Sequence, residues 1–348
     1  MQSVTIGNNQ AGQRLDKFLR KYLPSAGSSF LYKMLRKKNI TLNGKRAEGK
    51  EMLSVGDTVC FFFSEETFAK FSGSNAPQEH RDTPNASKLQ AITAYQEAYR
   101  SLTGIEVLYE DANIVILNKP MGILTQKAKP SDVSLNEWLI GYLLQEGCID
   151  EAELKTFHPS VCNRLDRNTS GIVLCGKTLA GSQALSRVIK ERLIQKFYHT
   201  ICLGELQEKQ LLKGYLKKDA ATNKVTISAS PSKEDAAEIW TAYEPLGTAH
   251  GYTLLEVELI TGKTHQIRAH LAGIRHPIIG DYKYGNLKQN NILKDKYQLE
   301  AQLLHACRMV FPTDETGVLA SLNGRSIEAP YPQLFQRIKN DMGFHNEH

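Results

Sequence analysis

Several features that would place this chain in a specialised class are missing from its 348 residues. The six cysteines form no Cys-x-x-Cys pair, which argues against a zinc site of the usual spacing and against a disulfide framework. No stretch approaches the roughly 18 consecutive apolar residues that a membrane helix needs. The first residues also lack a charged segment followed by an apolar block, so we expect a soluble, cytoplasmic protein without a membrane partner.

Recognisable cofactor motifs are lacking as well. The sequence contains neither a glycine-rich phosphate loop nor a dinucleotide fingerprint, so we expect chemistry that uses no cofactor. Hydrophobic content of 41% and charged content of 23% are ordinary for a globular protein, and the length favours two domains or one large domain with an appendage. The net charge of +6 is only mildly basic, so the informative feature is where the charges lie along the chain.

A charged loop that leads into an apolar strand, at residues 163–174, is the most informative stretch. One acid, Asp166, stands between Arg164 and Arg167, and a turn-forming Asn-Thr-Ser-Gly sequence follows. Neighbouring positive charge favours the ionised form of a carboxylate. From these residues alone, a structural ion-pair cluster at the start of a strand is the simpler interpretation, and a catalytic carboxylate is the alternative.

A second run, at residues 259–271, closes an alternating strand and opens a helix for which Thr264 is the expected N-cap. Three histidines in and after it, His265, His270 and His276, could suggest a metal site. On a helix with 3.6 residues per turn, His265 and His270 would lie about 140° apart, and no cysteine pair is near them. We therefore expect no metal site here.

Together with two further segments, these runs resemble the RluA-type pseudouridine synthases, which isomerise uridine in RNA. The family pattern HRLDxxTSG corresponds to residues 163–171, and TGRxHQIRxH corresponds to residues 261–270. Residues 107–122 are similar to the family's opening strand pair, and residues 195–198 to the strand that carries its active-site tyrosine. Four ordered motifs at the right spacing are far more specific than any one of them.

The resemblance implies roles for individual side chains. Asp166 would be the essential nucleophile or base, Tyr198 would contact the uracil and accept its carbon-five proton, and Arg268 would pair with Asp166. Arg164 would insert into the RNA where the flipped base had been. Without the resemblance, Arg164 is a second ion-pair partner for Asp166, and a lone strand tyrosine is part of the core.

The chain departs from the family pattern at two positions. Asn163 stands where the family usually has histidine, and Lys263 stands where it usually has arginine. Neither position needs to be an acid or a base in this chemistry, so the expected activity is unaffected. Contacts with RNA, to which Lys263 would contribute, would differ.

A first domain is expected at residues 12–63, with two helices and a hairpin signalled by Asn43-Gly44. It resembles the alpha-L fold, a small RNA-binding domain named after a ribosomal protein of the small subunit. Basic side chains at the end of the second helix and on the hairpin would contact RNA phosphates, namely Lys37, Lys38, Lys45 and Arg46. A solvated helix face is the alternative explanation of this charge.

A linker is expected at residues 64–104, because the segment 72–87 is rich in turn residues and almost free of apolar ones. A spacer helix within it would carry the stripe Leu89, Ile92, Tyr95 and Tyr99. The catalytic domain would occupy residues 105–340, where a run of strands with inserted helices indicates an α+β fold with a mixed or mainly antiparallel sheet.

The resemblance points to bacterial large-subunit (23S) ribosomal RNA as the substrate, with transfer RNA as the alternative. The enzyme would act as a monomer and would flip the target uridine into its pocket. Two other classes of function share these features: a catalytically silent RNA-binding protein of the same fold, and a base-excising hydrolase that would release free uracil.

Overall fold

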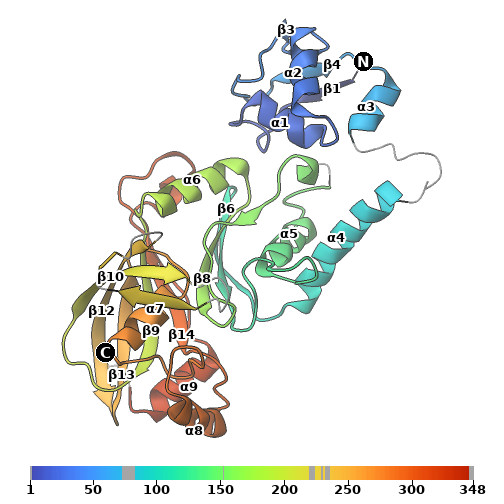
Figure 1. Ribbon diagram of the computed structural model, residues 1–348. Helices are drawn as coiled ribbons and strands as arrows, with labels where there is room; N and C mark the ends of the chain where they lie inside the picture. Colours follow the sequence, from blue (N-terminus) through green and yellow to red (C-terminus); the bar gives the residue numbers. More distant parts are fainter. Residues whose placement is uncertain are drawn as a thin grey trace.

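Two separate β-sheets organise the chain, a small one near the N-terminus and a large one that contains most of the other strands (Figure 1). The structure is a computed structural model that describes residues 2–72, 83–151, 153–218, 224–228, 230–231 and 236–344. Residues 73–82, which are part of the expected linker 64–104, lie outside these ranges, and so does the side chain of Leu89.

The small sheet is antiparallel, with the strand order β1-β4-β2-β3. Its strands are β1 (Gln2–Thr5), β2 (Ile40–Leu42), β3 (Lys45–Arg46) and β4 (Thr58–Phe61). Three helices pack with it around one apolar core, α1 (Leu15–Tyr22), α2 (Ser28–Arg36) and α3 (Glu65–Phe71). The predicted hairpin is confirmed, because Asn43 and Gly44 join β2 to β3 with the positive φ angles, 51° and 71°, that a type I′ turn requires.

A long helix, α4 (Thr83–Ser101), runs beside α5 (Leu135–Gln145) (Figure 1). Of the predicted stripe, Tyr95 and Tyr99 pack against the core of the large sheet. Gly141 permits the close approach of the two helices, since a Cβ there would lie 2.1 Å from the carbonyl oxygen of Tyr95. The C-terminal end of α4 therefore packs as part of the unit that contains the large sheet, and it is more than a spacer between domains.

In the described residues the large sheet has eleven strands, and its main path runs β11-β10-β12-β13-β9-β14-β8-β6-β5. Among the pairings of the described strands, only that of β8 with β14 is parallel, which confirms an α+β fold with a mixed, mainly antiparallel sheet. The strands are β5 (Glu106–Glu110), β6 (Ile114–Lys119), β7 (Ser160–Val161), β8 (Ser170–Gly176), β9 (Gln195–Leu203), β10 (Gln210–Lys218), β11 (Val225–Ser228), β12 (Ala237–Ala249), β13 (Tyr252–Leu259), β14 (Leu304–Val310) and β15 (Ser326–Glu328).

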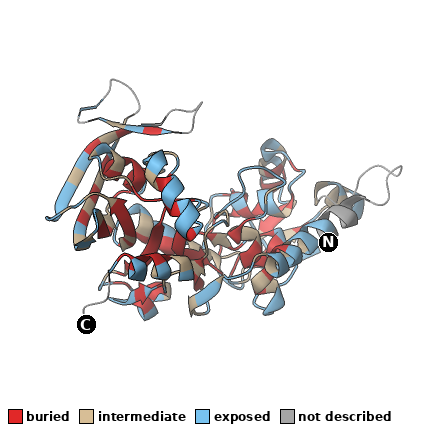
Figure 2. Cartoon of the chain, turned by 90° about the horizontal axis from the view of Figure 1, so that it is seen from below, coloured by how far each residue is buried: buried red, intermediate tan, exposed pale blue. Residues whose placement is uncertain are grey.

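Further helices pack around this sheet, namely α6 (Leu179–Lys190), α7 (Gln266–Gly273), α8 (Leu287–Tyr297) and α9 (Gln333–Asp341). Two short 3-10 helices, η1 (Glu153–Lys155) and η2 (Gly317–Leu322), complete the unit. Figure 2 shows that buried residues follow the strands and the helix faces that lie on them. In the described parts of the chain, no helix has both the length and the apolar character needed to cross a membrane.

The predicted N-cap of α7 is wrong. The helix begins at Gln266, and its N-cap is His265, which adopts a left-handed conformation with φ 55° and makes no side-chain cap bond. The side chain of Gln266 instead bonds the loop before the helix, because its Oε1 accepts the backbone N–H of Lys263 at 3.1 Å. Thr264 is exposed and lies one residue too early to cap.

The parallel pairing of β8 with β14 sets the position of the loop that precedes β8. At Gly171, where φ is 112°, the two strands approach so closely that a Cβ would lie 2.2 Å from the carbonyl oxygen of Ala306. Only glycine fits this contact and this backbone conformation without a shift. The Asp166 loop is thereby fixed against the centre of the sheet.

We expect Gly171→Ala to lower the free energy of unfolding by about 2 kcal/mol or more, because the new Cβ would overlap Ala306 and the φ angle disfavours any side chain. Gly273→Ala is the matched control, since its Cβ would meet open space. Chemical denaturation measures both. Equal stability of the two variants would contradict the close contact of β8 with β14.

Candidate active site

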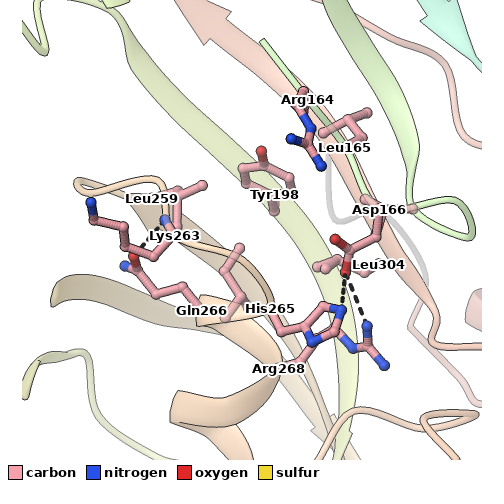
Figure 3. A pocket seen from close by; sticks show the side chains of 12 residues that line it. Arg164, Leu165, Asp166, Tyr198, Leu259, Lys263, His265, Gln266, Arg268 and Leu304 are labelled. Atoms are coloured by element: carbon pink, nitrogen blue, oxygen red, sulfur yellow. Dashed lines mark hydrogen bonds and ion pairs between the residues drawn. The ribbon is translucent and has the colours of Figure 1, made fainter. Parts of the chain in front are cut away.

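Asp166 lies in the loop between β7 and β8 and lines a cavity of about 470 Å³. Arg164, Lys263, His265 and Arg268 line the same cavity. An adjoining recess of about 60 Å³ shares these five side chains and extends to Tyr198. The structure thus brings together, from β9, α7 and two loops, the site residues expected in this part of the chain (Figure 3).

The expected pair of Asp166 and Arg268 is present. Nη1 of Arg268 donates to Oδ2 of Asp166 at 3.0 Å, and the arginine side chain is only 8% exposed. Burial alone would lower the pKa of Arg268, but the two carboxylates beside it, Asp281 and Asp166, raise it above its usual value and keep the guanidinium charged. Figure 3 shows this bond at the wall of the pocket.

Asp281, which the sequence analysis did not identify, orients Arg268 from the other side. Its carboxylate accepts hydrogen bonds from Nε and Nη2 of Arg268, at 2.7 and 2.9 Å. The side chain of Asp281 is fully buried. Oδ1 also accepts the backbone N–H groups of Lys283 and Tyr284. In the sequence this acid looks like a solvated turn residue, and the one available signal is its place two residues after the apolar pair 278–279.

The two arginines that flank Asp166 in the sequence do not pair with it in the described residues. Nε of Arg167 donates to the carbonyl oxygen of Gly122 at 2.9 Å, and Arg164 is exposed at the mouth of the cavity. The simpler interpretation of this run, a local ion-pair cluster, is therefore wrong. The positive charge beside Asp166 comes from Arg268, which is 102 residues away in the sequence.

Lys119 is a second residue that the sequence analysis did not single out for the site. It is completely buried, and its Nζ donates to the carbonyl oxygens of Pro120, Ile123 and Arg167 at 2.9, 2.9 and 3.1 Å. Burial lowers the pKa of Lys119 to about 7, against the opposing charge of Asp166. Its three bonds tie the loop after β6 to the loop that carries Asp166.

Tyr198 lies on β9 and is buried, at the base of the smaller recess. Within the described residues its hydroxyl has no hydrogen-bond partner, and Figure 3 shows it directed toward Arg164. Burial raises the pKa of Tyr198, and the nearby charge of Asp166 raises it further, so the phenol stays neutral. A neutral phenol can pack against a base but is a poor proton acceptor.

Lys263 is exposed in the loop between β13 and α7, at the edge of the larger cavity. Gln266 fastens this loop to β12, since its amide nitrogen donates to the carbonyl oxygen of Trp240 and to Oγ1 of Thr241, both at 2.9 Å. Asn163 has a structural role instead, because its Oδ1 accepts the backbone N–H of Leu174 at 2.7 Å. Of the two departures from the family pattern, only Lys263 faces the cavity.

The basic residues expected to bind RNA on the first domain are all exposed: Lys37, Lys38, Lys45 and Arg46. They do not line the Asp166 cavity. Arg46 lines a separate groove of about 580 Å³, which lies between α2 and the β2–β3 hairpin and also includes Arg36 and Tyr32. The structure thus separates these charges from the Asp166 pocket.

One group of side chains, on a different part of the sheet, has the composition of a metal site. Ligand atoms of His199, Glu256 and Cys307 all lie within 4.8 Å of one another. However, Arg308 donates to the carboxylate of Glu256 at 2.7 Å, and Tyr331 bonds Nδ1 of His199 at 2.5 Å. These bonds already satisfy the group, and a cation would have to displace Arg308, so the residues do not fit a metal ion.

Comparisons with known proteins agree with this geometry. A family model described as RNA pseudouridylate synthase matches residues 113–273. An uncharacterized RNA pseudouridine synthase of Mycoplasma genitalium is 30% identical over 325 residues, which cover 92% of this chain and 93% of the relative. Ribosomal large subunit pseudouridine synthase C of Rickettsia bellii is also 30% identical, over 96% of this chain and 99% of the relative.

The fold is similar to that of a solved structure, human RNA pseudouridylate synthase domain containing 4, with a TM-score of 0.55 and 20% identity. The alignment covers 73% of this chain and 97% of that one. The fold is thus that of a pseudouridine synthase. The chain belongs to the RluA-type family of these enzymes, which are isomerases that convert uridine to pseudouridine in RNA.

Asp281→Asn tests whether the ion pair of Asp281 with Arg268 stabilises the fold around the pocket. Burial by itself would raise the pKa of Asp281, but Arg268 outweighs this effect and holds the pKa below 3.8. The ion pair therefore stabilises the fold fully above about pH 3.8 and ceases to do so as the pH falls through the folded-state pKa. At pH 7 the variant should lose about 3 kcal/mol of unfolding free energy, because a buried guanidinium loses the more deeply buried of its two carboxylate partners.

Denaturation curves at pH 7 and at acidic pH measure this effect. The variant should show a smaller loss of stability on acidification than the unmodified protein, since the titrating group is gone. Asp314→Asn, at an exposed position, is the control and should change neither quantity. Unchanged stability of Asp281→Asn would show that Arg268 does not depend on Asp281.

Proposed function

We propose that this protein isomerises uridines of large-subunit ribosomal RNA, with Asp166 as the reacting carboxylate. The observation that supports this most is the asymmetry of the Asp166 side chain. Oδ2 is held by Arg268 at 3.0 Å, whereas Oδ1 has no hydrogen-bond partner among the described residues. In Figure 3 the second oxygen faces the side of the pocket on which Tyr198 lies.

Isomerisation breaks the bond between C1′ and N1, turns the uracil, and joins C1′ to C5. C5 loses a proton and N1 gains one, so no atom is added overall. Asp166 can add to the anomeric carbon, add to the base or remove a ribose proton, and each route uses a free carboxylate oxygen beside the nucleotide. Oδ1 meets that requirement, while Arg268 holds the other oxygen and compensates its charge.

The remaining side chains of the pocket would hold the flipped nucleotide. Tyr198 would pack against the uracil as a neutral phenol, and its raised pKa makes the second expected role, acceptance of the C5 proton, unfavourable. Arg164 is exposed at the mouth, where its guanidinium could occupy the gap that the flipped base leaves. Lys263, on the opposite edge loop, would contact a phosphate.

The assignment of the substrate rests on the relatives and on the first domain. Relatives named ribosomal large subunit pseudouridine synthase C align over nearly the whole chain, including its N-terminal part. We propose residues 12–63 as the RNA-binding domain and residues 105–340 as the catalytic domain, with α3 and α4 between them. One chain supplies all the proposed site residues, which supports action as a monomer, and transfer RNA is the alternative substrate.

Asp166→Asn should abolish isomerisation but retain the fold and most of the RNA affinity, because it removes the reacting charge and almost no volume. The measurement is the mapping of pseudouridines in ribosomal and transfer RNA of cells that lack the gene, with the unmodified chain or the variant supplied in trans. Restoration at large-subunit sites by the unmodified chain alone is the expected result. Restoration of pseudouridine in transfer RNA would show that transfer RNA is the substrate instead. Pseudouridine formation by the Asp166→Asn variant would contradict the proposed role of Asp166.

The two domains should make separable contributions to activity. The double variant Lys45→Ala and Arg46→Ala should weaken RNA binding and lower its salt slope by about one unit for each phosphate that is no longer neutralised, at unchanged turnover. Arg164→Ala should lower turnover at saturating RNA, since it acts during flipping. A matched control is Lys294→Ala with Lys296→Ala on α8, which lies at the far end of the molecule from the small sheet (Figure 1).

The reverse pattern, with lower turnover in the hairpin variant and only weaker binding in Arg164→Ala, would refute this division. Turnover at saturating RNA and salt titrations of affinity distinguish the two cases.

A further inference from the structure

His265 occupies a strained position beside the reacting carboxylate. Its backbone has φ 55°, in the left-handed region that glycine adopts at no steric cost. Its side chain is 11% exposed and lies between Asp166 and Tyr284. As the N-cap of α7 it makes no side-chain bond to the helix, so capping does not explain why a histidine stands here.

Hydrogen bonds around the ring determine which nitrogen carries the proton. The backbone N–H of Val225 donates to the hydroxyl oxygen of Tyr284 at 2.9 Å, and that hydroxyl lies 2.9 Å from Nδ1 of His265. The hydroxyl hydrogen of Tyr284 is therefore available for Nδ1. With Nδ1 as the acceptor, a neutral imidazole carries its hydrogen on Nε2.

The surroundings of the ring favour this neutral form. Burial lowers the pKa of His265 below 6.5, and the cations Arg268 and Lys283 act in the same direction. Asp166 and Asp281 oppose them without reversing the shift. Tyr284, the other group that faces the ring, has a raised pKa because of burial and stays protonated. At neutral pH the ring is thus an N–H donor.

Nε2 of His265 faces the same carboxylate oxygen that Arg268 holds. Its distance to Oδ2 of Asp166 is 3.7 Å, longer than a hydrogen bond, and Figure 3 shows both groups directed at this atom. Catalytic hydrogen bonds are often long in an empty pocket and shorten when the substrate binds. Two donors on Oδ2 would leave Oδ1 as the oxygen that meets the nucleotide.

We propose that His265 is a positioning residue for Asp166: its Nε2–H, fixed by Tyr284, holds Oδ2 so that Oδ1 is presented to the ribose or the base. This inference rests on the proposed role of Asp166 and adds a residue to it. His265 transfers no proton. In its left-handed conformation the residue places the ring between Tyr284 and Asp166.

Two amide substitutions separate the functions of the two ring nitrogens. In His265→Gln the amide nitrogen can take the place of Nε2, whereas in His265→Asn the shorter amide reaches only the place of Nδ1. Asparagine tolerates the left-handed backbone better than glutamine does. Stability should therefore favour the asparagine variant, and turnover should favour the glutamine variant.

We expect His265→Asn to lower kcat at least about tenfold with the apparent RNA KM within about twofold, since a hydrogen bond to a charged group is removed. His265→Gln should keep kcat within about threefold of the unmodified chain. His265→Gly removes the ring altogether, although it relieves the backbone strain, and should lose as much turnover as the asparagine variant.

Matched controls exist within the chain. His250 also has a positive φ, 53°, but is exposed in the turn between β12 and β13, so its asparagine and glycine variants should keep full turnover. Tyr284→Phe removes the group that fixes Nδ1 and should lower kcat about threefold. Tyr282→Phe, which removes a hydroxyl bonded to the carbonyl oxygen of Asn290, should not.

The assay is release of tritium from C5-labelled uridine in an RNA on which the unmodified chain forms pseudouridine, combined with melting curves of every variant. Full turnover of His265→Asn would overturn the inference while leaving Asp166 in its proposed role, provided that Asp166→Asn is inactive. Equal losses of turnover in the asparagine and glutamine variants would also overturn it. Activity of Asp166→Asn would instead overturn the proposed function on which the inference rests.

Discussion

One buried guanidinium holds the candidate active site together. Arg268 projects from α7 and bonds two carboxylates, Asp281 in the loop after its own helix and Asp166 in the loop before β8. A buried charge is tolerated only when it is paired and hydrogen-bonded, so neither carboxylate can move without cost. Because Asp281 accepts the hydrogen bonds of Nε and Nη2, Nη1 of Arg268 is available to bond Asp166 and orient it toward the pocket.

Several locally unfavourable features of the backbone and of buried side chains lie near the Asp166 loop. Gly171 lets β8 lie directly against β14, Lys119 ties three carbonyl groups of two loops together, and His265 keeps a left-handed backbone. Each feature is unfavourable for a local stretch of chain taken alone. They persist because the surrounding sheet determines the backbone there, as is common where a side chain must be aimed at a substrate.

Polar side chains of the small domain bond the unit that contains the large sheet. Nδ2 of Asn9 donates to Glu153 at 2.8 Å, and Nε2 of Gln10 donates to Thr156 at 2.9 Å. Polar contacts of this kind are typical of domains that can adjust relative to each other. Such adjustment would suit the proposed function, in which the charges of the first domain and the Asp166 pocket contact one folded RNA at two places.

The sequence by itself determined the family, the α+β class, the Asn43-Gly44 hairpin and the pairing of Arg268 with Asp166, because each depends on short motifs whose chemistry is local or whose spacing is specific. It did not reveal Asp281 or His265, since an acid in a turn and a histidine at a helix start look ordinary. Their importance arises only when the sheet brings chain segments a hundred residues apart to one carboxylate. Thr264 illustrates the same limit: local capping preference predicted it as the N-cap of α7, whereas the helix begins one residue later, at Gln266, whose side chain is bonded to β12.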